Sequence, residues 1–200
     1  MDGKSFALHG DNVSYRFHVS QSTGDLITDH FGGPATENGI TAEPCRADGW
    51  STPISRVCRE FPDLGRGDFR TPAVQIRQAA GHTVSDFRYK SHGVVEGKPA
   101  LPGLPSTFGG VDDVSTLVVH MYDSYSSIEA ELSYSIFPKY DAIARSVKIT
   151  NKGNDTITLE KLASLSVDLP QDELELLELK GEWAREGLRV RRKVDFGTQG

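Results

Sequence analysis

The chain has 200 residues, of which 22 are basic and 28 acidic, so its formal net charge is −6. A chain of this length fits one domain, because it can bury roughly 70% of its unfolded surface without extra cross-links. The acidic balance argues against a nucleic-acid groove, which needs clustered positive charge to neutralise phosphates. The basic cluster at Arg189 to Lys193 is instead typical of a solvated face or an interdomain contact.

The sequence also argues against a membrane protein. No stretch approaches the roughly 18 apolar residues that a membrane-spanning helix needs. The first twenty residues lack the apolar core of a signal peptide. We expect secretion if a leader peptide has been removed and a cytoplasmic protein otherwise. The triplets Asn12-Val-Ser14 and Asn154-Asp-Thr156 are acceptor sequences for N-glycosylation, which slightly favour secretion.

Apolar and polar residues alternate with period two along several segments, as in antiparallel strands with one face toward a core. The clearest examples are residues 13–19, 128–136, 143–149 and 159–169. In the third of these, Arg145 stands in line with the apolar residues. Turn-forming residues at 151–155 separate the last two segments. Many short strands with Gly and Pro between them, and hardly any helical period, predict an all-β fold, an antiparallel β-sandwich with long loops.

Other segments give weaker signals. Leu117 to Tyr122 is a continuous apolar run, typical of a strand buried on both faces. Residues 172–180 fit either a helix or a strand with a bulge, and the surrounding β pattern favours the strand. Segments 32–60 and 91–114 show little alternation, so we expect long irregular loops there, which in a compact domain are usually functional or disordered.

Residues 61–73 join turn chemistry to a closely spaced acid and base. If the chain after Gly67 is extended, Asp68 and Arg70 project from one face of a strand and Phe69 from the other. Such a pair has two natural uses. It can form an internal ion pair that holds the strand, or it can clamp a neutral polyhydroxylated ligand, with the carboxylate accepting from hydroxyls and the guanidinium donating to oxygens.

The sequence predicts no metal site and no cofactor. Its six histidines show no HxH or HExxH spacing, and it contains no CxxC motif. Cys45 and Cys58 give two equal alternatives. They could form a disulfide that closes a short loop and contributes about 3 kcal/mol, or they could remain two thiols.

Several blocks of sequence succeed one another in the order of a known family. They are Gly65–Ala73, Thr83–Tyr89, Gly97–Pro105, Ser133–Phe137, Arg145–Val147, Thr150–Gly153, Ser166–Pro170 and Gly181–Glu186. In this succession the chain resembles the amino-terminal domain of family 36 glycoside hydrolases, the large α-galactosidases, and most closely the fungal members. The resemblance covers nearly the whole chain, so we expect a single domain over residues 1–200, with a β-sandwich of the supersandwich type.

The resemblance implies that both catalytic aspartates belong to a (β/α)8 barrel that follows this domain and is absent from this chain. A retaining glycosidase needs two carboxyl groups about 5 Å apart, and spacing singles out no such pair among the acidic residues. We therefore expect no catalytic residue here. In the family, the amino-terminal domain helps to close the active site of a neighbouring subunit, typically in a tetramer. The expected partners are the barrel, a homo-oligomer and a galactose-containing oligosaccharide.

Residues in the first long loop join Asp68 and Arg70 as expected substrate-binding residues. The indole of Trp50 can stack on the apolar face of galactose, and the carboxylate of Asp48 can accept from its hydroxyls. The alternative is that Trp50 packs the loop onto the sandwich and Asp48 caps a turn. The reaction implied for the complete protein is hydrolysis of terminal α-linked galactose with retention.

Two other functions stay open at this point: a free-standing carbohydrate-binding sandwich and a structural interaction domain. Saturable binding of galactose or raffinose by the isolated chain would indicate the binding module. Trp183 and Arg185 also fit the family's pattern, and we expect them at the join to the next domain, where an indole buries apolar area.

Overall fold

The computed structural model describes residues 4–36, 57–169 and 173–194, which form strands, turns and one short 3-10 helix, η2 (Pro138–Tyr140). The strands are β1 (Ser5–His9), β2 (Ser14–Val19), β3 (Leu26–Gly32), β4 (Val74–Arg77), β5 (Phe87–Glu96), β6 (Ser115–Asp123), β7 (Ile128–Phe137), β8 (Ala142–Asn151), β9 (Thr158–Leu162), β10 (Glu175–Lys180) and β11 (Leu188–Lys193). The all-β prediction is confirmed.

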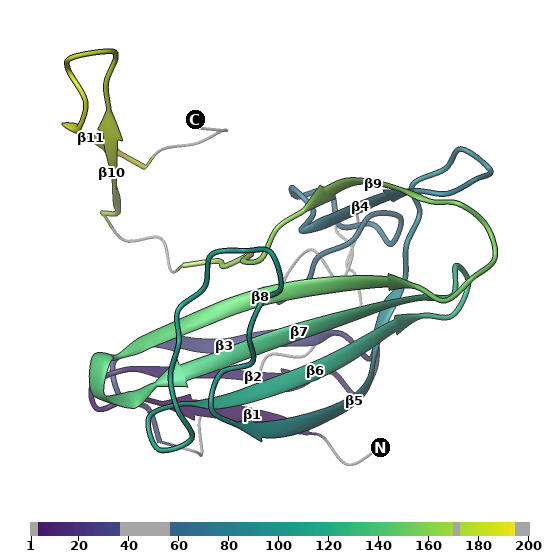
Figure 1. Cartoon of the computed structure of the whole chain (residues 1–200). Coiled ribbons are helices and arrows are strands. Elements are labelled where there is room, and N and C mark those ends of the chain that lie inside the picture. The colour runs from purple at the N-terminus through teal and green to yellow at the C-terminus, as the bar shows by residue number, and fades with distance from the viewer. Residues whose placement is uncertain (1–3, 37–56, 170–172, 195–200) are drawn as a thin grey trace. The chain divides into compact units, whose positions relative to one another are not determined.

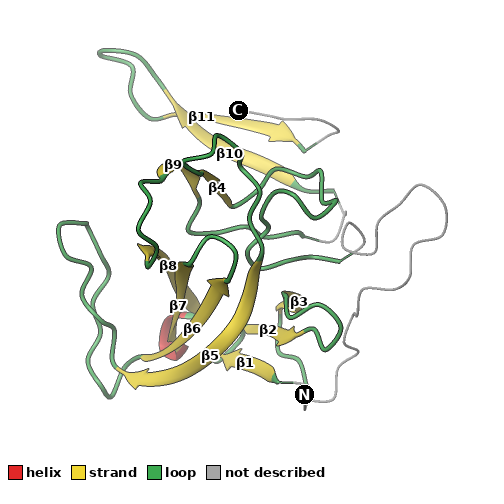
Figure 2. Cartoon of the chain, turned by 90° about the vertical axis from the view of Figure 1, so that its right-hand side faces the viewer, coloured by secondary structure: helices red, strands yellow, loops and turns green. Residues whose placement is uncertain are grey.

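Two antiparallel sheets form a sandwich. One sheet has the order β1-β2-β3 and the other the order β5-β6-β7-β8. The three-stranded sheet lies behind the four-stranded sheet in the first view (Figure 1). Figure 2 shows the same two layers from the side. A smaller antiparallel ladder pairs β4 with β9. The predicted antiparallel sandwich is therefore present.

The core lies between the two sheets, because the alternating strands turn their apolar residues inward. Phe17 of β2 and Tyr134 of β7 are fully buried and stack with their ring centroids 4.8 Å apart. Phe6 of β1 packs on Phe17 at 5.0 Å. Burying each such side chain stabilises the fold by about 1.5–3 kcal/mol. The predicted inward faces of residues 13–19 and 128–136 are confirmed.

The opposite face of β2 differs from the prediction. Alternation suggests that Ser14, Arg16 and His18 face solvent, yet all three are buried. Each has a polar partner: the Arg16 guanidinium donates to the carbonyl of Thr36 (2.7 Å), and the His18 ring pairs with the buried carboxylate of Asp29 (2.9 Å). The prediction failed because a sequence of alternating polarity cannot show that the chain after β3 returns to cover the polar face.

Two predictions about the large sheet need correction. Strand β6 buries Leu117 and Met121 on one face, but Val118 and His120 on the other face are only half-buried, so the run is not buried on both faces. Residues 91–96 were expected in a loop, yet they belong to β5. The side chains of these residues are exposed, and the segment is held in the sheet by backbone pairing with β6. Its sequence therefore shows no alternation of apolar and polar residues.

Strand β9 is shorter than alternation over 159–169 predicts, because it ends at Leu162. Its partner β4 begins at Val74, opposite Leu162, and the residue two before it is Pro72. The Ala73 carbonyl still accepts the N–H of Ala163 at 2.7 Å, but the Ala73 N–H donates to the carbonyl of Pro62 at 2.8 Å. Pro72 before it has no N–H to donate, so the ladder ends here. The loop at 151–155 is present as predicted, with Asn151 Oδ1 accepting the N–H of Gly153 at 2.9 Å.

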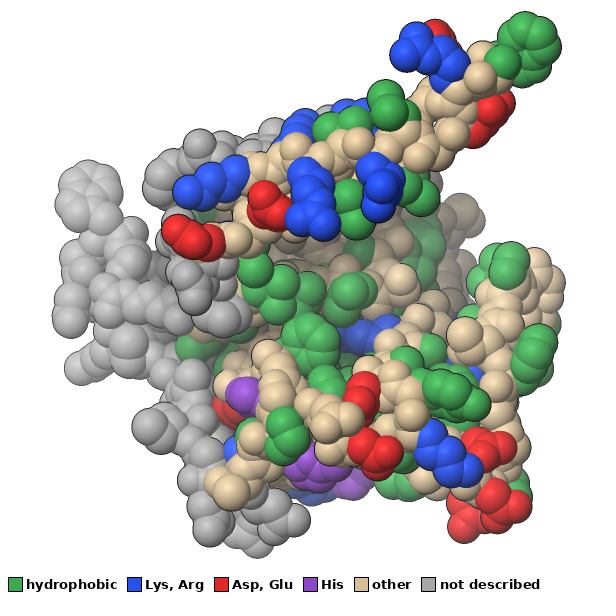
Figure 3. All heavy atoms as spheres, turned by 90° about the vertical axis from the view of Figure 1, so that its left-hand side faces the viewer, with side chains coloured by type: hydrophobic (Ala, Val, Ile, Leu, Met, Phe, Trp, Pro, Cys, Tyr) green, Lys and Arg blue, Asp and Glu red, His purple; other side chains and the backbone are tan. Residues whose placement is uncertain are grey.

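The chain forms two compact units, Met1–Val167 and Asp168–Gly200. The second unit contains the antiparallel hairpin of β10 and β11, so the strand predicted within residues 172–180 is confirmed over 175–180. The predicted bulge is wrong, because the two strands pair in continuous register. On the hairpin, Lys and Arg side chains stand among apolar ones (Figure 3). Leu177, Leu179, Trp183 and Leu188 are exposed. The hairpin thus presents apolar side chains that the described residues do not bury.

Candidate functional site

Two of the four expected substrate-binding residues, Asp48 and Trp50, lie outside the described residues, as does Cys45. The other two, Asp68 and Arg70, lie in a group of paired charges that we call the arginine–aspartate cluster. Its members are Asp25, Arg59, Asp63, Arg66, Asp68, Arg70, Asp86 and Arg88. The cluster contains equal numbers of each charge, so it is neutral as a whole.

The backbone brings the cluster together by one strand-like pairing and one tight turn. Residues 58–60 hydrogen bond to β3 at 2.8 and 3.0 Å, with Arg59 forming an isolated bridge. The chain then turns at Gly65, where φ is +104° and a Cβ would lie 2.6 Å from a methyl carbon of Val84. Both observations require glycine. This turn returns Asp68 to the side of Arg59, which Asp63 contacts from before the turn.

Arg59 is the centre of the cluster, with a side chain that is 1% exposed. Its Nη1 donates to Asp63 Oδ1 at 2.7 Å and to Asp25 Oδ1 at 3.4 Å, and its Nε donates to Asp68 Oδ2 at 3.2 Å. A guanidinium has five N–H donors in a planar fork, which suits several carboxylates at once. Arg59 therefore ties Asp25, which is 34 residues away in the chain, to Asp63 and Asp68 of its own loop.

Arg66 extends the cluster from the same turn. Its Nη2 donates to Asp25 Oδ1 at 2.6 Å and to Asp63 Oδ1 at 3.0 Å. Its Nε pairs with Asp86 at 3.1 Å. Asp63 also accepts the backbone N–H of Phe87 at 2.9 Å. The start of β5 is thus tied to the turn that precedes β4.

Asp68 and Arg70 bind each other. Arg70 Nε donates to Asp68 Oδ1 at 2.9 Å, and Arg70 Nη2 donates to Asp68 Oδ2 at 2.8 Å, which makes a two-pronged pair. The residues precede β4, which begins only at Val74, so they do not lie on the strand that was expected directly after Gly67. Phe69 points away and is 92% exposed. The geometry is that of an internal ion pair, and the role of the pair toward a sugar stays a prediction.

The arginines of the cluster lower the pKa of two of its carboxylates, whereas burial outweighs them at Asp63 and raises the pKa of that carboxyl. Burial pushes the pKa of Asp25 upward, but the hydrogen bonds and charge of Arg66 outweigh it, so the pKa lies below its ordinary value. Asp68 behaves in the same way: its burial is outweighed by side-chain and backbone hydrogen bonds from Arg70, and its pKa is also lowered. The partner Arg66 has a raised pKa, because its acidic neighbours outweigh its burial.

Only part of the cluster reaches solvent. The side chains of Asp25, Asp63 and Asp68 are at most 2% exposed, whereas Arg70 is 36% exposed. Asp86 is also open to solvent. A sugar approaching from outside would therefore meet Arg70, Asp86 and Arg88, which is 37% exposed, and would not meet the inner carboxylates. The inner part of the cluster holds the loop, and its outer part offers guanidinium donors and a carboxylate acceptor to a ligand.

A second buried network, centred on Glu60, was not predicted from the sequence. The Glu60 carboxylate accepts from Tyr15 (2.7 and 2.8 Å), from Tyr134 (3.0 Å) and from Thr28. Arg145 Nη1 pairs with Glu60 at 3.2 Å, and its guanidinium lies 4.5 Å from the Tyr134 ring centroid. Burial and then the charge of Glu60 raise the pKa of both tyrosines. The sequence contained one signal of this network: Arg145 occupies an apolar position in the alternating segment 143–149, where a charged residue needs a buried partner.

Beside this network lies a cavity of about 250 Å³. Its lining includes Tyr15, Phe31, Ile143, Arg145 and Leu165. The wall is mostly apolar, and the Tyr15 hydroxyl and the Arg145 guanidinium on it already bind Glu60 and each other. This cavity therefore has few unused polar groups with which to orient a sugar.

Among the described residues, no group of three or more His, Cys, Asp or Glu side chains is arranged to hold a metal ion. Within the same residues, no helix has the length and apolar character to cross a membrane.

A family profile described as "Glycosyl hydrolase family 36 N-terminal domain" matches residues 24–200. The whole chain is 72% identical to "Alpha-galactosidase 2" of Hypocrea jecorina and 58% identical to "Alpha-galactosidase C" of Emericella nidulans. In both comparisons it spans 27% of the length of the relative.

Solved structures that resemble this chain are also of α-galactosidases. The crystal structure of α-galactosidase AgaA from Geobacillus stearothermophilus in complex with raffinose matches with a TM-score of 0.86 at 30% identity. That match covers 98% of this chain and 29% of AgaA. The α-galactosidase from Lactobacillus brevis matches with a TM-score of 0.85 at 32% identity, covering 96% of this chain and 27% of that protein.

Proposed function

Because the chain belongs to the amino-terminal domain family of the family 36 glycosyl hydrolases, we propose that it is the first domain of an α-galactosidase. The complete protein would hydrolyse terminal α-linked galactose from oligosaccharides with retention. The observation that carries this proposal is the 72% identity to an α-galactosidase over the whole chain, together with the family match over residues 24–200. The chain spans only 27% of that relative, so most of the enzyme would follow this domain.

We assign the chain a non-catalytic part in that reaction. A retaining glycosidase needs a nucleophile and an acid/base that both touch the sugar. The carboxylates of Asp25, Asp63, Asp68 and Glu60 are buried and already paired with arginines. Such groups stabilise a fold, but they cannot reach a substrate. The catalytic carboxyl groups would then lie in the barrel implied by the family resemblance.

The contribution of the domain to substrate binding would come from Asp48, Trp50, Asp68 and Arg70. Arg70 supports this, because it is partly exposed while Asp68 and the carbonyl of Val57 (2.7 Å) fix its guanidinium. Val57 directly follows the segment that contains Asp48 and Trp50. An oriented guanidinium can donate to the oxygens of a neutral sugar, and we propose that Arg70 faces the active site of a neighbouring subunit in a homo-oligomer.

The β10–β11 hairpin would join the domain to the barrel. A two-stranded hairpin is marginally stable by itself in water. Trp183 is 92% exposed and Leu179 72% exposed, so packing against the rest of the enzyme would bury the apolar surface that the hairpin presents. Trp183→Ala in the full-length protein should then lower its thermal midpoint. Tyr140→Ala, at a residue of similar exposure in η2, should leave that midpoint unchanged.

The test of the proposed activity uses the full-length protein and raffinose. Proton NMR distinguishes α-galactose from β-galactose before the two anomers equilibrate. We expect α-galactose to appear first, since double displacement retains the anomeric configuration. Release of β-galactose first would contradict the retaining reaction, and no release of galactose would contradict the proposed activity.

A further inference from the structure

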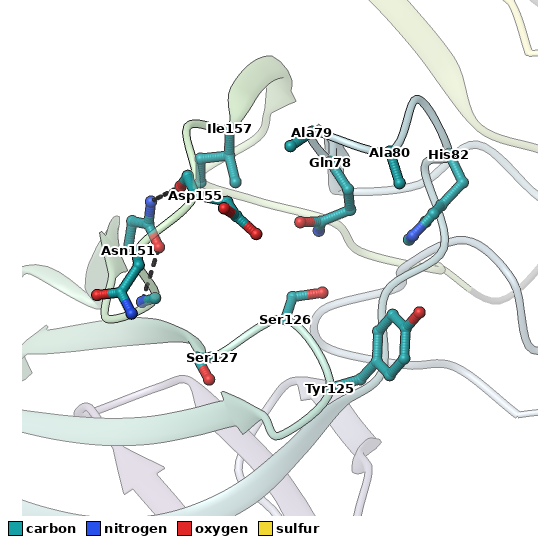
Figure 4. A pocket seen from close by; sticks show the side chains of 12 residues that line it. Gln78, Ala79, Ala80, His82, Tyr125, Ser126, Ser127, Asn151, Asp155 and Ile157 are labelled. Carbon is teal, nitrogen blue, oxygen red and sulfur yellow. Dashed lines mark hydrogen bonds between the residues drawn. The ribbon is translucent and has the colours of Figure 1, made fainter.

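Three turns of the first unit enclose a cavity of about 550 Å³, which we call the three-turn pocket (Figure 4). The turns are residues 78–82 after β4, residues 125–127 between β6 and β7, and residues 151–157 between β8 and β9. This volume is within the range of about 300–1,000 Å³ that is typical of small-molecule sites. Neither Asp68 nor Arg70 lines the pocket.

Three polar atoms in the lining have no partner among the described residues. They are Gln78 Nε2, His82 Nδ1 and Ser126 Oγ, and each is buried. A buried polar group without a hydrogen bond usually costs about 1–3 kcal/mol, so a cluster of three calls for an explanation. These side chains point into the same space (Figure 4). A ligand that offers several hydroxyl groups would satisfy them together.

The rest of the lining defines the chemistry of that ligand. Tyr125 is 78% exposed and lies beside His82 with ring centroids 5.9 Å apart, so an aromatic surface is available for stacking. Asn154 and Asp155 add amide and carboxylate groups that pair with hydroxyls. No lysine or arginine occurs among the described lining residues, which argues against a phosphate or carboxylate ligand.

The pocket is held in shape before any ligand arrives. Asp123 Oδ1 accepts the backbone N–H of Tyr125 (3.0 Å) and of Ser126 (3.2 Å), which fixes the second turn. In the third turn, Asn151 Nδ2 donates to the carbonyl of Asp155 at 2.8 Å. A site that is ordered in advance loses less conformational entropy when it binds.

We propose that the three-turn pocket binds a pyranose ring of a neutral saccharide, with Tyr125 stacking on its apolar face and Gln78, His82 and Ser126 bonding its hydroxyls. This site is additional to hydrolysis and does not depend on it. The sugar has two candidate sources. One is a free galactoside, and the other is an N-glycan, because Asn154 begins the acceptor sequence Asn154-Asp-Thr156.

The test titrates the 200-residue chain, made in a bacterial host that adds no glycan, with galactose, raffinose and N-acetylglucosamine, followed by NMR. We expect saturable shifts of the His82 and Tyr125 ring signals. Tighter binding of galactose or raffinose identifies a free galactoside as the source, and tighter binding of N-acetylglucosamine identifies the glycan. Absence of saturable binding by all three sugars would overturn the proposal and would leave the proposed α-galactosidase activity untouched.

Three variants locate the binding. Tyr125→Ala should weaken binding about five- to tenfold, because it removes the stacking surface. Tyr140→Ala, at a tyrosine of similar exposure that does not line the pocket, should bind as the unaltered chain does. Gln78→Met should weaken binding without lowering the thermal midpoint, because it removes an unpaired buried amide. Equal affinity for Tyr125→Ala and Tyr140→Ala, or a destabilised Gln78→Met that binds normally, would contradict the assignment.

Discussion

Replacing Arg59 with methionine tests whether the arginine–aspartate cluster holds the first unit together. The Arg59 side chain is 1% exposed and donates to three carboxylates, the closest being Asp63 at 2.7 Å. Breaking a buried ion pair by removing one partner typically destabilises a protein by about 3–5 kcal/mol, since it leaves an uncompensated charge. Each of the three carboxylates keeps a second arginine, so we expect the lower limit, about 3 kcal/mol.

Urea unfolding of the 200-residue chain, followed by circular dichroism, measures this loss. With a slope of about 2–3 kcal/mol per molar urea, Arg59→Met should lower the midpoint by about 1 M. The matched control is Arg77→Met, which breaks the more exposed pair with Glu160 and should change the free energy of unfolding by less than about 1 kcal/mol. Equal midpoints for the two variants would refute the stabilising role of the cluster.

Three further outcomes follow from the same contacts. Because the pKa values of Asp25 and Asp68 are lowered on folding, their contribution to stability is present above the ordinary value of 3.8 and disappears as the pH falls through the folded values. Asp63, whose pKa is raised by burial, contributes in the opposite sense. Because two groups act against one, acid titration of the unfolding free energy should show a decline below about pH 4. Gly65→Ala should destabilise the chain by about 1–3 kcal/mol in urea unfolding, and by more than Gly81→Ala, where φ is also positive but an added Cβ meets nothing within 4 Å. Tyr134→Phe should cost about 1–2 kcal/mol by removing a hydroxyl that donates to a buried carboxylate, and a change within experimental error would exclude that contribution.

The parts of the fold that alternate in polarity were predictable, because burial of one face leaves a period of two in the sequence. Strand β7 shows this most clearly, since its apolar residues are fully buried on the inward face. The second half of β5 was missed for the opposite reason: residues 91–96 are exposed and held by backbone pairing, which leaves no side-chain pattern. The prediction from polarity was also wrong for β2, because its polar face is covered by the chain that follows β3.

The pairs of charged residues show the same limit: a pair that is close in the sequence was predictable, and pairs that are distant in the sequence were not. Asp68 and Arg70 are two residues apart, so their pairing could be proposed from spacing alone. Arg66 and Asp25 are 41 residues apart, and Arg145 and Glu60 are 85 apart. Nothing in a single sequence connects such pairs, because the fold alone brings them together. The three-turn pocket was missed for the same reason, since its residues come from three separate turns.

The central claim is that this domain supports an α-galactosidase whose catalytic carboxylates lie outside these 200 residues. The most direct measurement compares the release of p-nitrophenol from p-nitrophenyl α-galactoside by the 200-residue chain and by the full-length protein at equal molar concentration. We expect release by the full-length protein and none above the uncatalysed rate by the chain alone. Turnover by the isolated chain, abolished by substitution of one of its own carboxylates, would contradict the claim.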